Sequence, residues 1–491
     1  MKSPVAQTGK GVQAAEQTGK VIAVHGSVVD VVFDEAVKIP VMKEILQTET
    51  YDGQEVILET VEYRDEKTVR CFALTPTFGL SRHAPVLRTR ASLSIPQGDA
   101  VLGRVVNVLG EPIDKKGPIV TSERYSVWQS EVREKVLVEK AEKGETEPIE
   151  TGIKMIDLLF PLLRNTKTGI IGGAALGKSL LTLEIIHNIV KKQKWLCVFT
   201  GAGERIREGN ELYFEFQRSN ILPQSVLIFG QMDESPGARF EVVSTGIAFA
   251  EALQAKGHSI LFLMDNVFRF AQAGSELSAL LGRIPSETGY QPTLTSEIGE
   301  FHERISSREG ASITAIEAVY VPADDLTDPA VVCIFAHLDS ILVLSRERVQ
   351  KGLYPAIDPL MSSSAFLNPN IVGKRHFGIA QDVIRLFHKQ EELQRLVAIV
   401  GIEELSKSDR VLFHRARKMS NFLTQPFFTA ELYTNRPGQY VSLEETLAAC
   451  ERVIAGRMDA VPDEDFYMRG TLPAPIGERP GLKEEPPSHR G

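Results

Sequence analysis

The sequence predicts an α/β protein with three folded parts: an N-terminal β-barrel, a central domain built on a mostly parallel sheet, and a C-terminal helical bundle. Three observations predict this fold class. Short β-branched strands cluster near the N-terminus, strands and helices alternate through the middle, and apolar residues at helical spacing dominate the end. At 491 residues the chain is too long for one hydrophobic core.

We place the domain boundaries where these patterns change. The barrel is expected over residues 18–93, the central domain over 94–373 and the helical domain over 374–470. Residues 1–17 have no periodicity, and the segment 471–491 is rich in proline, so we expect two disordered tails.

The barrel prediction depends on β-branched runs that turn residues interrupt. Strands are expected at residues 21–24, 28–33, 55–63 and 68–74. Residues 64–67 (RDEK) have the composition of a hairpin loop. Several strands with no helix between them suggest a small closed barrel.

The central domain shows apolar strand-like runs separated by helical stretches. The runs fall at residues 196–199, 226–229, 260–264, 313–321 and 341–344. Helical patterns at 180–191 and 239–255 separate some of them. This alternation is typical of a mostly parallel sheet covered on both faces.

The C-terminal part has apolar residues three and four apart. Helices are expected at residues 377–400, 407–423 and 442–457. Ser442 and Glu445 have the spacing of a capping box, which predicts where the last helix begins.

Bulk composition excludes several classes of protein. The chain has 43% hydrophobic and 24% charged residues, an ordinary soluble composition, and its net charge of −9 argues against non-specific nucleic-acid binding. The four cysteines lie far apart, so we expect buried free thiols in a reducing compartment and neither zinc nor disulfides. We find no apolar run of transmembrane length and no signal-peptide pattern, so membrane association is expected only through partners.

The most informative segment is a glycine-rich turn with the spacing G-x-x-x-x-G-K-[ST]. It follows a short apolar run and precedes a helical pattern. Such a turn directs backbone N–H groups and a helix N-terminus at one point, which suits nucleotide phosphates. An unrelated βα turn is the alternative, but the order of strand, motif and helix favours nucleotide binding. The segment comprises Gly172, Gly173, Ala174, Ala175, Leu176, Gly177, Lys178 and Ser179.

Two further segments place carboxylates at the ends of predicted strands. Asp265 ends the run 260–264, where it can hold water bound to Mg²⁺; a helix cap is the alternative. The segment GAGERIREGN (201–210) follows the run 196–199. In it Glu204 can polarise an attacking water and Arg205 can hold a γ-phosphate, whereas a solvated charged loop is the alternative.

Several long motifs stand in order along the chain. After the phosphate loop come GAGERIREGN, residues 261–294 (LFLMDNVFRFAQAGSELSALLGRIPSETGYQPTL), YVPADDLTDP (320–329), FAHLDSILVLSR (335–346) and LYPAIDPL (353–360). Together they resemble the catalytic beta subunit of F-type ATP synthases, from about residue 19 to about residue 470. The resemblance implies a RecA-like central nucleotide-binding domain and a Mg²⁺-dependent ATP synthase or ATPase that binds ATP and ADP.

The resemblance also implies roles for individual residues. Lys178 would contact the β- and γ-phosphates, Ser179 would bind Mg²⁺, and Glu204 would activate water. Glu208 and Asp265 would organise the magnesium waters. The remaining matches are the γ-phosphate arginines Arg205 and Arg269, and the adenine-enclosing aromatic residues Tyr354, Phe427 and Tyr433.

The partners implied by the resemblance are other subunits of a rotary enzyme. Three copies would alternate with three alpha subunits, each supplying an arginine finger in trans. Central-stalk gamma and epsilon subunits would couple ATP turnover to proton or sodium transport through a membrane sector. The chain would then lie peripherally on the cytoplasmic face of a bacterial inner membrane, with no nucleic acid bound.

The chain departs from the family pattern at four places. Ala175 replaces a glycine, and an alanine at positive φ costs on the order of 1 kcal/mol, so we expect a less well-formed phosphate loop. Ala365 replaces an arginine that faces the alpha subunit's nucleotide, so weaker retention of that nucleotide is expected. Cys333-Ile334 replaces two threonines, and residues 403–409 (EELSKSD) form a less acidic version of the family's stalk-contacting loop. These changes suggest a diverged paralogue, such as a sodium-associated second-locus type.

Three other functions compete with this one. A related hexameric secretion ATPase shares the core, but YVPADDLTDP, the GYQPTL segment and the adenine aromatics favour the synthase. A hexameric RNA helicase would need RNA-binding loops and usually a basic patch, but the acidic charge balance and the absence of an RNA motif argue against it. A non-hydrolysing assembly subunit would explain Ala175, but Lys178, Ser179, Glu204, Asp265 and Arg269 are all retained.

Overall fold

The computed structural model describes residues 18–34, 38–128, 148–173, 175–305, 307–308, 311–321 and 325–472. The tail expected at 1–17 and nearly all of the one expected at 471–491 lie outside these ranges. The chain divides into two compact units. The first contains the described residues of 1–145, with 165–169 and 193–338; the second contains those of 146–164, 170–192 and 339–491.

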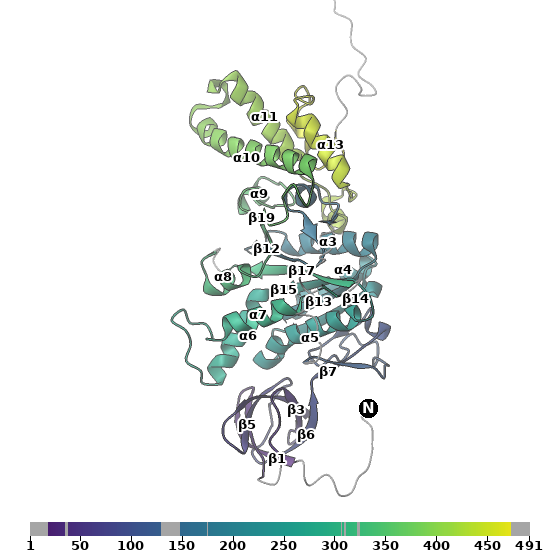
Figure 1. Cartoon of the computed structure of the whole chain (residues 1–491), viewed down its shortest axis with the longest axis vertical. Helices are drawn as coiled ribbons and strands as arrows, with labels where there is room; N and C mark the ends of the chain where they lie inside the picture. The colour runs from purple at the N-terminus through teal and green to yellow at the C-terminus, as the bar shows by residue number, and fades with distance from the viewer. Residues whose placement is uncertain are drawn as a thin grey trace, which may run out of the picture. The chain divides into compact units, whose positions relative to one another are not determined.

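The first unit begins with a closed six-stranded barrel, drawn in purple in Figure 1. Its antiparallel strands run in the order β1-β2-β5-β4-β3-β6, and β1 closes the ring on β6. Valines and leucines of alternating strand positions fill its core. The strands are β1 (Thr18–His25), β2 (Val28–Val32), β3 (Glu44–Glu49), β4 (Glu55–Tyr63), β5 (Thr68–Ala73) and β6 (Pro85–Ser92).

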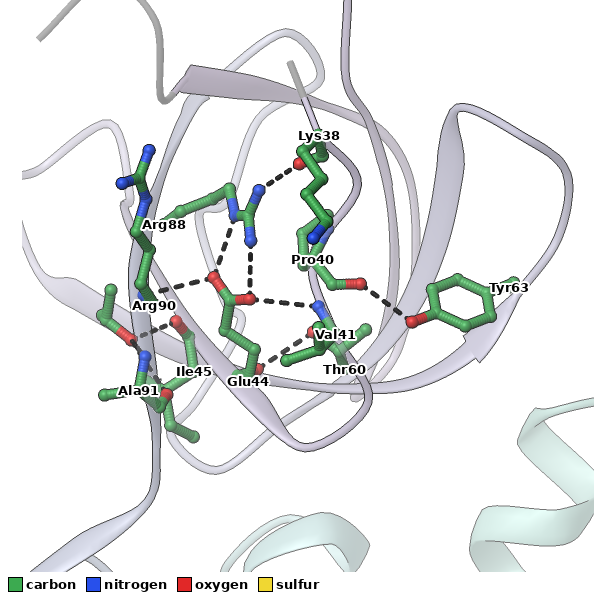
Figure 2. Close-up of polar contacts among 11 residues, drawn as sticks. Lys38, Pro40, Val41, Glu44, Ile45, Thr60, Tyr63, Arg88, Arg90 and Ala91 are labelled. Atoms are coloured by element: carbon green, nitrogen blue, oxygen red, sulfur yellow. Dashed lines mark hydrogen bonds and ion pairs between the residues drawn. The ribbon is translucent and has the colours of Figure 1, made fainter.

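A buried ion pair joins two barrel strands (Figure 2). The Glu44 carboxylate accepts hydrogen bonds from Nε and Nη2 of Arg88 at 2.9 and 2.8 Å. It also accepts from the backbone N–H groups of Val41 at 3.0 Å and Arg90 at 3.2 Å. Because the Glu44 side chain is only 1% exposed, this charge is compensated by bidentate pairing rather than by water.

Parallel strands of the first unit run in the order β17-β15-β13-β14-β8. In this register Gly201 of β13 lies opposite Asp265 of β15, so the carboxyl ends of both strands meet at one edge. Helices α5 and α6 pack on these strands. The strands are β8 (Val105–Val106), β13 (Leu196–Glu204), β14 (Ser225–Gln231), β15 (Ile260–Asp265) and β17 (Ala311–Tyr320); β7 (Ser94–Pro96) pairs with β9 (Arg124–Ser126), and β16 (Ser307–Arg308) pairs with β17.

Strand β12 (Lys167–Gly172) starts in the first unit and ends in the second. Beside it in the second unit the strand order is β19-β18-β12, and the backbone N–H of Leu344 donates to Ile171 O at 2.7 Å. The other strands here are β10 (Pro148–Ile149), β11 (Leu162–Leu163), β18 (Ser340–Val343) and β19 (Ser363–Ser364).

The helices follow the periodic stretches of the sequence. Those of the first unit are α4 (Ile206–Arg218), α5 (Pro236–Gln254), α6 (Val267–Leu280), α7 (Leu294–Arg304) and α8 (Pro329–Phe335). Those of the second are α2 (Lys154–Leu159), α3 (Lys178–Gln193), α9 (Arg346–Gln350), α10 (Lys374–Val400), α11 (Lys407–Phe422), α12 (Glu431–Thr434) and α13 (Leu443–Ile454), with the short 3₁₀ helix η6 (Phe428–Ala430). Helices α10, α11 and α13 pack together, and none of the helices in the described ranges is long and apolar enough to cross a bilayer.

The fold class predicted from the sequence is confirmed: a barrel, a central domain with parallel strands and a helical C-terminal region. Ser442 and Glu445 form the expected capping box at the start of α13. The four cysteines are free, and three of them are buried. Strands β3 and β6 were not predicted, because charged side chains interrupt their apolar pattern: Glu44 and Glu49 in β3, and Arg88 and Arg90 in β6.

Candidate nucleotide-binding and catalytic residues

The glycine-rich segment lies between β12 and α3, as the sequence predicts. Ala175 and Gly177 have φ angles of 61° and 87°, so the chain turns tightly in the left-handed region before the helix starts. A Cβ added at Gly177 would meet nothing within 4 Å, so backbone conformation rather than crowding favours glycine there. Ala174 lies outside the described residues.

The end of the loop places Lys178 and Ser179 in the first turn of α3. Nζ of Lys178 donates a hydrogen bond to the carbonyl of Gly172 at 2.6 Å, which folds the ammonium back over the loop. Leu176 is buried and anchors the loop, whereas Ser179 is exposed. Gly173 is buried at the exit of β12. First-turn N–H groups lack intrahelical acceptors, so this loop and helix end are suited to bind an anion.

The three aromatic residues matched to an adenine site also belong to the second unit. Tyr354 is tied to the segment before Phe427, because the backbone N–H of Gln425 donates to Tyr354 O at 3.0 Å. Phe427 is only 6% exposed, whereas Tyr354 and Tyr433 are 37% and 74% exposed. Phe427 is therefore mainly a packed side chain, and the two tyrosines are the ones open to a ligand.

The predicted catalytic carboxylates lie at strand ends of the first unit. Glu204 is the last residue of β13 and is 5% exposed, and Asp265 is the last residue of β15 and is half-buried. The strand β13 runs further than the sequence indicated, through all of GAGE (201–204), because Gly201, Ala202 and Glu204 continue its parallel pairing with β14. The helix α4 then begins at Ile206 and carries Glu208 in its first turn.

These carboxyl groups shift one another's pKa values. Burial, a hydrogen bond with Glu208 and the charge of Asp265 raise the pKa of Glu204 to about 9, although Arg269 acts in the opposite direction. The same hydrogen bond lowers the pKa of Glu208. Near neutral pH the proton shared by this pair therefore resides on Glu204. A buried carboxyl whose charge depends on its neighbours is typical of a catalytic position.

The two arginines differ in their surroundings. Arg269 of α6 donates through Nη1 to the carbonyl of Gly203, which places its charge beside Glu204. Arg205 pairs with Glu208, Nη1 to Oε1, at 3.6 Å, and its side chain is 63% exposed. The structure therefore brings Glu204, Glu208 and Arg269 together, and Arg205 joins them only through an exposed ion pair.

Oxygen donors of the kind that Mg²⁺ prefers occur in each unit. In the second unit Ser179 offers an exposed hydroxyl, and in the first unit Asp265 and Glu208 offer carboxylates. Within the described residues no cluster of three or more His, Cys, Asp or Glu side chains could hold a metal by itself.

Sequence reasoning missed one polar residue of this region. Glu184 lies on α3, fully buried, and both of its carboxylate oxygens accept hydrogen bonds from residues 428 and 429. The available signal was an acidic residue within a mostly apolar stretch, 183–190, that the helix buries.

The fold and the phosphate loop define a P-loop nucleotide-binding protein. The nucleotide-binding domain model of the ATP synthase alpha/beta family matches residues 152–364, and the β-barrel domain model of the same family matches residues 21–90. Because these two models together span more than half of the chain, the chain belongs to the ATP synthase alpha/beta family. A third model, the C-terminal domain of V and A type ATP synthase, matches residues 367–462.

Proposed function

We propose that this chain is the catalytic beta-type subunit of a rotary ATP synthase, which interconverts ATP and water with ADP and phosphate. Ion transport, of protons or sodium, would be coupled through partner subunits. The observation that carries the proposal is the carboxylate Glu204, held at the end of β13 beside Glu208 and Arg269. The family of the chain supports ATP as the nucleotide.

The residues of this chain would divide the chemistry among them. Lys178 and the loop N–H groups would bind the β- and γ-phosphates, and Arg269 and Arg205 would offset charge that develops on the γ-phosphate. Tyr354, Phe427 and Tyr433 would enclose the adenine. Bound Mg²⁺, held by Ser179 with Asp265 and Glu208 acting through its waters, would supply further positive charge.

Glu204 would orient the attacking water and take up its proton. A general base must be ionised to accept a proton, so the high pKa of Glu204 has to fall when the site fills. Positive charge brought near the carboxyl lowers its pKa, and Arg269 already acts in that direction. Nucleotide binding and activation of the base would therefore be linked.

The F-type assignment is supported by the ordered motifs from GAGERIREGN to LYPAIDPL. The second candidate is the catalytic subunit of a V- or A-type enzyme, which the match of residues 367–462 favours. Either way we expect an alternating ring with alpha-type partners, an arginine supplied in trans, and a central stalk. We also expect a peripheral position on the cytoplasmic face of a bacterial membrane.

The test is Mg²⁺-dependent ATPase activity of the chain reassembled with its alpha-type partner. Glu204→Gln should lower kcat by about 10²–10⁴-fold, because a general base of this kind contributes that much. An equally low activity in the wild-type and variant assemblies would instead identify a non-hydrolysing subunit. The subunits that co-purify with the native complex separate an F-type enzyme from a V- or A-type one, and a complex without stalk subunits would favour a secretion ATPase.

A further inference from the structure

Glu184 connects the helix that follows the phosphate loop to the segment that carries the adenine-site residues. It lies on α3, six residues after Lys178, and is fully buried. Its Oε1 accepts a hydrogen bond from the backbone N–H of Phe428 at 3.1 Å. Its Oε2 accepts from the backbone N–H and from Oγ1 of Thr429, each at 3.0 Å. One carboxylate thus binds three donors of a segment 244 and 245 residues further along the chain.

These donors are the first residues of the 3₁₀ helix η6, whose own N-cap residue is Phe427. No side chain of the cap binds the free N–H groups of η6. Glu184 provides the missing acceptor from another helix. Helix α3 therefore helps to hold η6 in position.

A second contact fixes the same segment on the same helix. The rings of His187 and Phe428 lie 5.0 Å apart, centroid to centroid, and His187 is one turn beyond Glu184 on α3. Burial raises the pKa of Glu184, and so does the nearby charge of Glu431 on α12, whereas the N–H and hydroxyl donors lower it. Among the described residues, the carboxylate is held by hydrogen bonds from Phe428 and Thr429 and not by an ion pair with a lysine or arginine.

We propose that Glu184 is a positioning residue that fixes the adenine-binding segment at a set distance from the phosphate-binding end of α3. This inference depends on the function proposed above, which places adenine near Phe427 and Tyr433 and phosphates at Lys178. Because Glu184 is fully buried, it would act through this segment rather than by contact with the nucleotide. Its effect is on base recognition, because it holds residues 427–433 while the phosphate loop is built by residues 172–179.

A glutamine at this position is a close isostere with a different hydrogen-bonding capacity. Its carbonyl oxygen can replace one of the two carboxylate oxygens, but its amide NH₂ group at the other position faces a backbone N–H, which is left without an acceptor. Glu184→Gln therefore displaces η6 without emptying the site. Thr429→Val removes the hydroxyl contacts with Glu184 and with the carbonyl of Leu180 and keeps both backbone bonds, so its effect should be smaller.

The experiment compares two ligands by titration calorimetry of the full chain: ATP and inorganic tripolyphosphate, each with Mg²⁺. Glu184→Gln should weaken ATP binding on the order of tenfold, since bonds to a charged group are lost, and leave tripolyphosphate binding unchanged. Thr429→Val should shift the same ratio less. Lys191→Ala, an exposed change on the same helix, is the control and should alter neither ligand.

Each outcome decides the matter. Parallel weakening of both ligands by Glu184→Gln and Thr429→Val would show a general structural role and overturn the positioning role. Unchanged ATP binding in both variants would also overturn it. A wild-type chain that binds neither ligand would refute the proposed function, and with it this inference. If Glu184→Gln does not fold, the ATP-to-tripolyphosphate ratio of Thr429→Val decides.

Discussion

Replacing Ala175 by glycine tests whether the phosphate loop is strained. Ala175 has a φ angle of 61° on an exposed turn, where a Cβ costs roughly 1 kcal/mol or more relative to glycine. Glycine would remove this cost from the folded state. Glycine would also raise the conformational entropy of the unfolded chain, which lowers the free energy of unfolding by about 0.4–1 kcal/mol. The unfolding midpoint should therefore change little. Nucleotide affinity should respond more, because binding requires the ordered loop.

The expected gain in affinity follows from the strain. If about 1 kcal/mol opposes the binding-competent loop, Ala175→Gly should tighten ATP binding by up to about fivefold. Titration calorimetry with ATP and Mg²⁺, together with turnover of the reassembled complex, measures this. Ala279→Gly is the matched control: Ala279 is exposed on α6, and glycine there should lower stability by up to about 1 kcal/mol without changing ATP affinity. An Ala175→Gly variant with unchanged affinity and unchanged turnover would refute the strain argument.

Two further predictions concern charge. Burial is the main cause of the raised pKa of Glu204, and Glu208 raises it further. Glu208→Gln removes that second contribution, so the pKa of Glu204 should fall and the acid limb of kcat/KM should move to lower pH. A limb that stays in place would contradict the assignment of Glu204 as the base. Arg88→Met leaves the buried carboxylate of Glu44 without its cationic partner. It should lower the free energy of unfolding by about 3–5 kcal/mol, as measured by urea denaturation. Arg64→Met, in an exposed hairpin loop, is its control, and an equal loss from both changes would show that the pair is not the cause.

Much of the fold could be predicted from the sequence, because turn residues and hydrophobic periodicity are local signals. The hairpin loop at residues 64–67 separates β4 from β5 as expected, and α11 begins at Lys407, where its periodic pattern begins. Strands β3 and β6 were not predicted, because pairing with neighbouring strands stabilises them more than their own composition does. Barrel closure is a non-local property that no short window contains.

The local positions of the candidate site residues could be predicted from the sequence for a similar reason. The spacing of Gly172, Gly177 and Lys178 fixes a turn between strand and helix, and Asp265 and Glu204 stand where strands end. The raised pKa of Glu204 could not be predicted from the sequence, because it depends on burial and on a hydrogen bond with Glu208, four residues later. The exposure of Arg205 likewise became visible only with side chains in place.

By itself the sequence determined the order of elements, the glycine-rich turn and the residue types at strand ends. These depend on backbone conformation and hydrophobic periodicity, which act over a few neighbouring residues. The tertiary structure decided which distant groups meet: the carboxylate of Glu184 with the backbone of residues 428 and 429, and the guanidinium of Arg88 with Glu44. Such contacts form because burial removes water from a polar group and requires a partner, and only the folded chain supplies one.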